Sequence, residues 1–418
     1  MSNYFFKYFK EANLKKDYVS IICGPDNIRA RKNFKENYLF FDLNQMVFSK
    51  KFLFKSLIIF LKLIIKTKLS YKNFRLSLAL SLIIPVIKHK SIKKIICFQD
   101  YSITGKALKK VLKEEVTLLG LQHSMRDNRT DRKKLIDGYD HYFLWDDYKN
   151  KLISKKNNLI KFGALKSYII LEKYKKWNYL KKNFTTNKTL VLISSFSKYH
   201  ENFDKIFLNN LNKDEKIKKV NSVYNKFKNK KILLNNYERQ ALEYFILCDS
   251  VGKFIKKYNF KLIIIGRNYK NRFKENKTIV NTESEKNFYK FFFNNFKIIN
   301  LGFFKRLNKA MEFKNSIFIS NVSSFGKEMM ALNYKVIFYS FLTSPMNPDY
   351  YDRRSLFCCL TRSESKFHNS ILRLNNLSFQ KYIKEKKRNK KSFFSFEPSK
   401  VKFQNFINLT GLKLKNKY

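Results

Sequence analysis

Glycine and proline are scarce in this chain of 418 residues, which contains 10 Gly and 5 Pro. All-β sandwiches, barrels and propellers need many tight turns, and low-complexity linkers are rich in the same two residues, so this composition argues against both. Hydrophobic residues nevertheless make up 44% of the chain and aromatic residues 17%. A chain of this length and apolar content is expected to fold into two globular domains.

Cysteine is also rare, and its five copies show neither a CxxC pair nor the spacing of zinc ligands. They are Cys23, Cys97, Cys248, Cys358 and Cys359. Their odd number and their apolar neighbours favour buried free thiols in a reducing compartment.

No apolar run reaches the length of about 20 residues that spans a bilayer. The run 52–65 is interrupted by Lys55 and Lys62, and the run 76–87 is shorter still. Residues 1–16 carry charges throughout and lack the apolar segment of a secretory signal. The segment 52–65 reads as a basic amphipathic helix, which could lie in a membrane interface or pack on the protein's own sheet.

Acidic residues are few, since 32 Asp and Glu stand against 87 Lys and Arg and leave a net charge of +55. A coding bias toward A and T would explain the excess of Lys, but it would also permit Asp and Glu, so their scarcity suggests an anionic partner. Nucleic acid and an anionic membrane surface are the two candidates. The lysines are spread along the whole sequence, and no zinc-finger, RNA-binding-sheet or helix-turn-helix pattern stands out. This favours the membrane surface and leaves nucleic acid as the alternative.

Short apolar strands alternate with helical segments along the chain, which implies parallel strands joined by crossover helices. The first series of strands is expected at 18–23, 39–43, 94–98, 116–121, 142–145 and 159–162. The second series is expected at 189–194, 261–265, 296–301, 317–320 and 336–339.

The polar, lysine-rich segment 172–188 separates the two series of strands. We therefore expect an N-terminal domain at 1–180, a C-terminal domain at 181–380, and a basic tail with a terminal helix at 381–418. Within the second domain, the charged stretch between the first strand and residue 230 is expected to be partly mobile.

The segment 317–339 reads as strand, Ser-Ser turn, short helix, strand. Ser323 and Ser324 start the helix, where free backbone N–H groups and the positive dipole end favour a phosphate. Glu328, placed by this interpretation on the first turn, could accept hydrogen bonds from a sugar diol. The same spacing is also that of an ordinary helix cap, and spacing alone does not separate the two interpretations.

Three local patterns resemble GT-B type glycosyltransferases of bacterial surface polysaccharide synthesis, the capsule and lipopolysaccharide kind. They are Gly-Leu-Gln-His-Ser at 120–124, Tyr-Phe-Leu-Trp-Asp-Asp-Tyr at 142–148 with 161–167, and the serine segment 323–328 with 335–338. Ser124 departs from the family, which commonly has Gly there. The resemblance implies an α/β fold of two Rossmann-like domains that face each other across a cleft, with the terminal helix packing back toward the N-terminal domain. It also implies metal-independent catalysis without a cofactor.

Glycosyl transfer needs a base for the acceptor hydroxyl and a cation or dipole for the leaving phosphate. His123, at the carboxyl end of the expected strand 116–121, is the first candidate for the base, because a histidine titrates near neutral pH. Asp100 and Asp127, on strand-end loops of the same domain, are its rivals. Arg267, just after the strand 261–265, could bind the donor phosphate with its fork of donors.

The sequence thus predicts a cytoplasmic glycosyltransferase, peripheral at the inner face of the cytoplasmic membrane. It would move a sugar from a nucleotide-sugar donor to a surface polysaccharide or a lipid-linked acceptor. Its expected partners are this donor, the glycan or lipid-linked acceptor and the anionic membrane surface, with no nucleic acid. Two alternatives stay open: a polyol-phosphate transferase of the CDP-glycerol type, and a basic nucleic-acid-binding protein.

Overall fold

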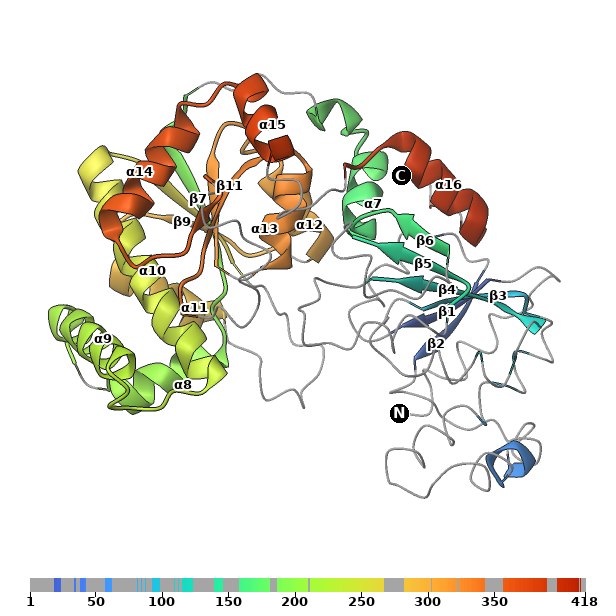
Figure 1. Cartoon of the computed structure of the whole chain (residues 1–418), viewed down its shortest axis with the longest axis horizontal. Helices are drawn as coiled ribbons and strands as arrows, with labels where there is room; N and C mark the ends of the chain where they lie inside the picture. The colour runs from blue at the N-terminus through green and yellow to red at the C-terminus, as the bar shows by residue number, and fades with distance from the viewer. Residues whose placement is uncertain are drawn as a thin grey trace. The chain divides into compact units, whose positions relative to one another are not determined.

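The computed structural model describes residues 19–23, 34, 38–42, 57–61, 81, 84, 87, 92–97, 109, 112, 115–122, 139–145, 158–180, 186–209, 211–266, 282–301, 303–321, 323–342, 356–388, 397–412 and 414. The chain divides into two compact units (Figure 1). Unit 1 comprises Met1–Ile169 and Phe396–Tyr418, and unit 2 comprises Ile170–Ser395. Unit 1 is therefore built from both ends of the chain.

Unit 1 contains a six-stranded sheet with the strand order β2-β1-β3-β4-β5-β6, in which every neighbouring pair is parallel. The burial of β3, β4 and β5 explains why their sequences are apolar without a polar alternation. The strands are β1 (Val19–Cys23), β2 (Tyr38–Asp42), β3 (Lys94–Cys97), β4 (Thr117–Leu121), β5 (His141–Leu144) and β6 (Asn158–Lys161).

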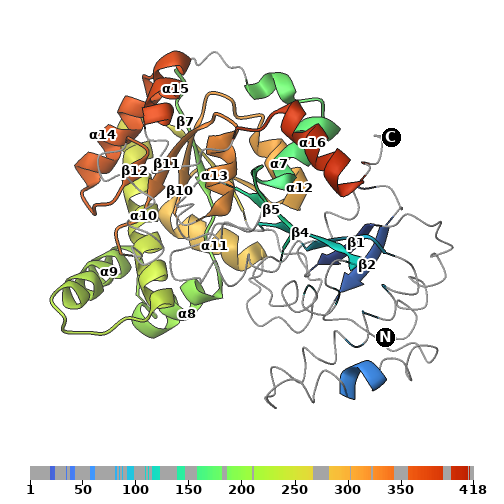
Figure 2. The same cartoon turned by 45° about the vertical axis from the view of Figure 1, so that its right-hand side comes forward.

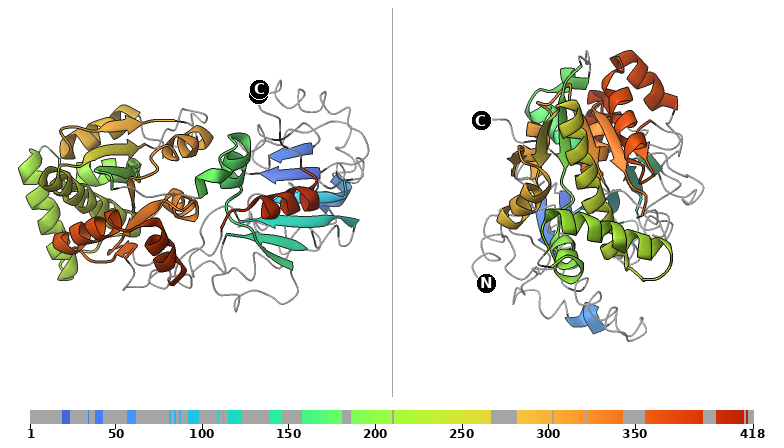
Figure 3. Two further views of the ribbon diagram at one scale, coloured as in Figure 1. Left: turned by 90° about the horizontal axis from the view of Figure 1, so that it is seen from above. Right: turned by 90° about the vertical axis from the view of Figure 1, so that its left-hand side faces the viewer.

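The last helix, α16 (Lys400–Thr410), packs on this sheet, as Figures 2 and 3 show. The ring of Phe406 stacks on Phe162 at a centroid distance of 4.6 Å and meets Phe143 of β5 edge-on at 5.0 Å. Phe403 stacks at 5.5 Å on Tyr168, which belongs to α7 (Leu165–Lys173). Aromatic side chains thus join the end of the chain to unit 1.

Unit 2 contains a second six-stranded parallel sheet, with the order β12-β11-β10-β7-β8-β9. Counted from its own first strand, this order is that of the dinucleotide-binding Rossmann fold. The central strands β10 and β11 are buried along their whole length. The strands are β7 (Thr189–Ile193), β8 (Lys261–Ile265), β9 (Lys297–Ile299), β10 (Ile317–Ser320), β11 (Lys335–Tyr339) and β12 (Cys358–Cys359).

Helices cover both faces of this sheet, with α10 and α11 on one side and α12 and α13 on the other (Figure 1). The helices of unit 2 that follow α7 and the 3-10 turn Trp177–Leu180 are α8 (Lys198–Phe207), α9 (Lys213–Lys228), α10 (Asn236–Tyr258), α11 (Thr282–Phe292), α12 (Phe303–Ala310), α13 (Ser324–Ala331), α14 (Glu364–Asn375) and α15 (Phe379–Arg388). The predicted α/β class with two Rossmann-like domains is confirmed. The expected boundary at 180/181 falls after the division between the units, and α15 belongs to unit 2 rather than to a C-terminal tail.

The stretch after β7, for which the sequence predicts no regular structure, forms α8 and α9. Asn212 and Glu215 make a reciprocal cap at the start of α9, with hydrogen bonds of 3.0 and 2.9 Å. Val220 and Val223 are buried on the inner face of α9. Two valines and a cap are a weak sequence signal for a helix among so many lysines. The remaining stability of α9 comes from its packing against α10.

Four of the cysteines, Cys97, Cys248, Cys358 and Cys359, are free and buried as predicted. Burial raises the pKa of the Cys248 and Cys359 thiols. Among the helices in the described part of the chain, none has both the length and the apolar character needed to cross a membrane.

Candidate functional site

The carboxyl ends of β7 and β10 meet at the topological switch point of unit 2. The chain runs from β7 outward to β8 and β9 and then returns to β10 on the other side of β7. In sheets of this kind ligands sit beyond the carboxyl ends of the strands at this point. Ile193 pairs with Ser320, so the residues that follow them, Ser194 and Asn321, leave the sheet side by side.

Ser323 and Ser324 lie at this edge, and both are half-buried rather than enclosed. Ser323 is the N-cap of α13, and its hydroxyl accepts a hydrogen bond from the Phe325 backbone N–H at 3.2 Å. Ser324 is the first residue of the helix, and its hydroxyl has no hydrogen-bond partner within the described residues. The cap interpretation therefore holds for Ser323, whereas the Ser324 hydroxyl makes no cap bond among the described residues.

Gly326 lets α13 lie directly against the end of β10. A Cβ atom at this position would come within 2.6 Å of the Ser320 Cβ and Oγ, and within 3.0 Å of the Phe338 ring. No side chain fits in that space. The glycine thus fixes the start of α13, with its free N–H groups and its positive dipole end, at the switch point.

Glu328 lies deeper than the sequence predicts. Because α13 begins at Ser324, Glu328 is on the second turn rather than the first, and only 3% of its surface is exposed. Its carboxylate is part of the interior of unit 2. The predicted contact with a sugar diol thus gains no support from the position of this side chain.

A second helix start follows β7 at the same edge, where Ser197 caps α8. The Ser197 backbone N–H donates to His200 Nδ1 at 3.0 Å, so this ring nitrogen carries no proton. His200 is buried, with its ring centre 5.0 Å from that of Tyr244. Sequence reasoning missed this helix start, although the Ser-Ser-Phe-Ser run at 194–197 after a strand was a signal of the same kind as Ser323 and Ser324.

A chain of buried hydrogen bonds supports the loop after β7. The Ser195 backbone N–H donates to Tyr244 Oη at 3.1 Å, and the two tyrosine hydroxyls of Tyr244 and Tyr289 are 2.6 Å apart. Tyr289 donates to Ser194 Oγ at 2.7 Å, and Ser194 donates to the carboxylate of Glu285. Burial raises the pKa of both tyrosines, which keeps their hydroxyls neutral. The loop is therefore held in one position before any ligand arrives.

A buried carboxylate on α10 supports the ends of β10 and β11 in the same way. Glu243 accepts hydrogen bonds from the Asn321 side chain and from the backbone N–H groups of Phe341, at 2.7 Å, and Leu342. Asn321 also donates to the Tyr339 carbonyl at 2.7 Å. Glu243 is fully buried, so its role is to position these strand ends rather than to meet a ligand.

Arg306 of α12 brings a positive charge to the start of α13, and sequence reasoning missed it. Its guanidinium group donates to the Gly266 carbonyl at 3.2 Å and lies 4.8 Å from the centre of the Phe325 ring. The side chain therefore links the end of β8 to the first turn of α13. A guanidinium at a helix start adds to the preference for an anion there.

Four predicted site residues lie outside the residues that the structure describes: His123, Asp100, Asp127 and Arg267. Their roles stay predictions. Gln122 accepts from the Trp145 backbone N–H at 2.8 Å, which joins the ends of β4 and β5.

Comparison with protein-family models gave no match, and no curated protein sequence matched either. Several solved structures are similar in fold. UDP-GlcNAc 2-epimerase from Neisseria meningitidis, bound to UDP-GlcNAc, has a TM-score of 0.48 and 10% identity over 94% of this chain and 100% of its own. A putative UDP-N-acetylglucosamine 2-epimerase from Listeria monocytogenes has a TM-score of 0.49 and 9% identity over 95% and 96%. The wall teichoic acid polymerase TagF has a TM-score of 0.45 and 10% identity over 96% and 89%.

Proposed function

We propose that this chain is a glycosyltransferase that takes a sugar from a nucleotide-sugar donor and passes it to a surface polysaccharide or a lipid-linked acceptor. The observation that carries the proposal is the hydroxyl of Ser324, which lies half-exposed and without a described partner at the start of α13. This helix start is at the switch point of a Rossmann-ordered sheet, where such folds bind nucleotides.

The chemistry of this edge suits a phosphate group. The N–H groups and dipole of α13 face the same edge as those of α8, and Arg306 adds a fixed positive charge. A leaving nucleoside diphosphate gains negative charge as the glycosidic bond breaks, so groups fixed in place beforehand would stabilise that transition state. In this proposal His123, Asp100 or Asp127 is the base in unit 1, and Arg267 joins Ser323 and Ser324 on the donor.

We further propose that the enzyme works on the anionic inner face of the cytoplasmic membrane. The net charge of +55 favours such a surface. On α15, Tyr382 and Lys386 face the protein while Lys384 and Lys387 are exposed. In the described helical segment 57–61, Leu57, Ile58 and Leu61 are 52%, 41% and 51% exposed, as an interfacial helix requires.

A thermal-shift screen of the full chain against UDP, GDP, CDP and CMP tests the donor site, because a ligand that binds only the folded state raises Tm. We expect one of these nucleotides to bind. Ser324→Ala should lower its affinity by at least about tenfold, which corresponds to the loss of one hydrogen bond to a charged group. Ser399→Ala is the matched control, since Ser399 caps α16 in unit 1 by accepting a bond of 3.2 Å, as Ser323 does in unit 2. Unchanged nucleotide affinity in Ser324→Ala and Ser323→Ala contradicts the proposed site.

Product analysis separates the two enzyme hypotheses. A glycosyltransferase leaves no phosphorus in its polymer, whereas a CDP-glycerol type transferase releases CMP and leaves a phosphodiester behind. Binding to duplex DNA with a steep salt dependence, and to none of the four nucleotides, would favour the nucleic-acid hypothesis instead. Sedimentation with anionic but not zwitterionic vesicles tests the membrane contact, which Leu57→Ser with Leu61→Ser is expected to weaken.

A further inference from the structure

Unit 2 contains a cavity of about 180 Å³ between α9, α10, the end of α11 and the start of α14. It shares no residue with the switch point between β7 and β10. An apolar cavity of about 150 Å³ is large enough to admit benzene. This cavity therefore has room for one ring, or a branched chain of similar size, with a small polar group.

Aromatic side chains make one wall of the cavity. Phe291 and Phe292 come from α11 and Phe245 comes from α10. The rings of Phe245 and Phe292 meet edge-on at a centroid distance of 5.7 Å, and both are buried. Such a wall favours an apolar body, and it favours a flat ring in particular.

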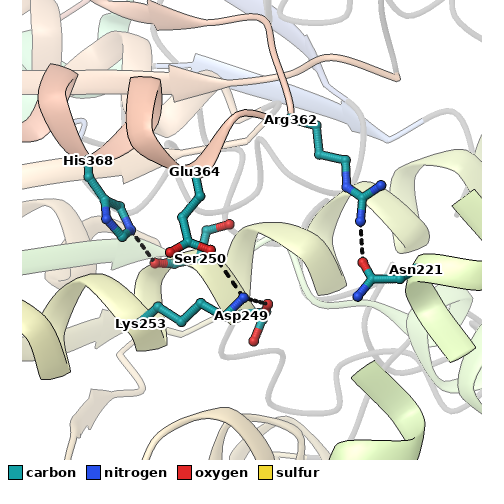
Figure 4. A network of polar contacts seen from close by, with 7 residues as sticks. All are labelled: Asn221, Asp249, Ser250, Lys253, Arg362, Glu364 and His368. Atoms are coloured by element: carbon teal, nitrogen blue, oxygen red, sulfur yellow. Dashed lines mark hydrogen bonds and ion pairs between the residues drawn. The ribbon is translucent and has the colours of Figure 1, made fainter. Parts of the chain in front are cut away.

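The two lysines of the cavity already have acidic partners. Lys216 forms an ion pair of 2.8 Å with Asp204. Lys253 lies between Asp249 at 3.0 Å and Glu364 at 3.1 Å, so it ties α10 to α14 (Figure 4). Burial opposes the charge on Lys253, but the hydrogen bonds that it donates to these two carboxylates prevail and raise its pKa. The charge of each lysine is thus already balanced by a carboxylate.

Arg362 differs from both lysines, because no carboxylate of the described residues pairs with it. Its guanidinium lies 4.2 Å from the centre of the Tyr224 ring. It donates to the side-chain oxygen of Asn221 (Figure 4). It also donates, more weakly, to the side-chain oxygen of Asn225 at 3.5 Å. Both acceptors are neutral amides. The ring and the amides hold the guanidinium in place and leave its charge, and part of its five donors, available.

We propose that this cavity binds a small organic monocarboxylate whose apolar body is a single ring or a branched chain of similar size. Its carboxylate accepts hydrogen bonds from Arg362, and its body packs against Phe245, Phe291 and Phe292. Arg362 lies in the short segment between β12 and α14, and Glu364 starts α14. The ligand would therefore join this segment to α9. The site is separate from the proposed donor site and does not depend on it.

Isothermal titration calorimetry on the full chain tests the site with benzoate and isovalerate as probes, and with benzamide and isovaleramide as neutral analogues of the same shape. We expect at least one acid to bind and its amide to bind at least about tenfold more weakly, because only the acid gains a charge-assisted bond. Arg362→Gln should lower the affinity for the acid by a similar factor. Arg373→Gln is the matched control, since Arg373 is an exposed arginine of the same helix region, outside the cavity.

A second variant guards against a general effect on folding. Ile217 is half-buried and lines the cavity, so Ile217→Trp should fill it and abolish binding while Arg362 remains. The proposal is overturned if neither acid binds, if amide and acid bind equally, or if binding survives either Arg362→Gln or Ile217→Trp. Nucleotide binding at the switch point should be unchanged in both variants, which keeps a failure here distinct from a failure of the proposed function.

Discussion

Gly326 on α13 lies against Ser320 at the end of β10, so closely that a Cβ on the glycine would stand 2.6 Å from the serine Cβ. Gly326→Ala should therefore push α13 away from the sheet and destabilise unit 2 by about 1–3 kcal/mol, the usual cost of overpacking. Because the helix start moves as well, nucleotide affinity should fall. Urea unfolding and the thermal-shift assay measure the two effects.

Gly252→Ala is the control for this prediction. Gly252 lies inside α10, where a Cβ would meet the Phe292 carbonyl oxygen at 3.2 Å and no backbone or side-chain atom closer. Part of that crowding is offset by the better helix propensity of Ala, about 1 kcal/mol. An equal loss of stability in the two variants would contradict the special role of the close contact at Gly326.

Glu243→Ala should destabilise unit 2 by about 3 kcal/mol, because it leaves the buried N–H groups of Phe341 and Leu342 and the amide of Asn321 without their acceptor. Glu238→Ala, on the same helix, removes a half-buried carboxylate that accepts from the Asn235 backbone N–H at 2.8 Å. It should cost about 1 kcal/mol or less. Urea unfolding compares the stability of the two variants. Similar losses of stability would show that the buried hydrogen bonds of Glu243 contribute no more than the cap bond of Glu238.

Lys335 predicts a dependence of stability on pH. It is 1% exposed, donates to the Asn375 carbonyl at 2.7 Å, and burial lowers its pKa to about 8. Between pH 8 and 10.5 the unfolded chain keeps this proton while the folded chain has lost it, so the free energy of unfolding rises with pH there. The full effect is about 3 kcal/mol. Below pH 8 both states are charged, and the cost of burying the charge is present in full.

The measurement is the difference in unfolding free energy between wild type and Lys335→Met from pH 7 to 10. We expect the free energy of unfolding of the wild type to rise relative to that of Lys335→Met as pH rises, because the variant has no charge at this position to lose. Lys381→Met, at an exposed position on α15, is the control variant. A flat difference for Lys335→Met would contradict the low pKa.

Phe406→Ala should destabilise unit 1 by about 3–5 kcal/mol, since the ring is buried between Phe162 and Phe143. Val401→Ala, on the same helix, removes a side chain that is 69% exposed and should change the stability by less than about 0.5 kcal/mol. Chemical unfolding followed by aromatic fluorescence distinguishes them. A neutral Phe406→Ala would mean that α16 does not belong to the core of unit 1.

The strands could be predicted because parallel sheets buried on both faces leave continuous apolar runs, as at 189–194 and 317–320. The short strand β12 left no such run, since it has only two residues. Helix α9 was missed for a different reason. Its buried apolar residues are too few to give the sequence a helical period, and they are buried by contact with α10.

The candidate site was predictable only where a single segment carries it. Ser323 and Ser324 sit at the start of a helix that their own sequence specifies. Arg306, His200 and Glu243 come from three other helices, and their approach to the same strand ends depends on how the sheet is ordered. The depth of Glu328 likewise depends on the close packing that Gly326 permits, which no spacing rule records.

The aromatic contacts of α16 set an order of events during synthesis. Ribosomes deliver a chain from its N-terminus, and domains ordinarily fold as they emerge. The first sheet must wait for Phe403 and Phe406, which are translated only after every residue of unit 2. Unit 1 should thus complete its fold only after all of unit 2 has been translated.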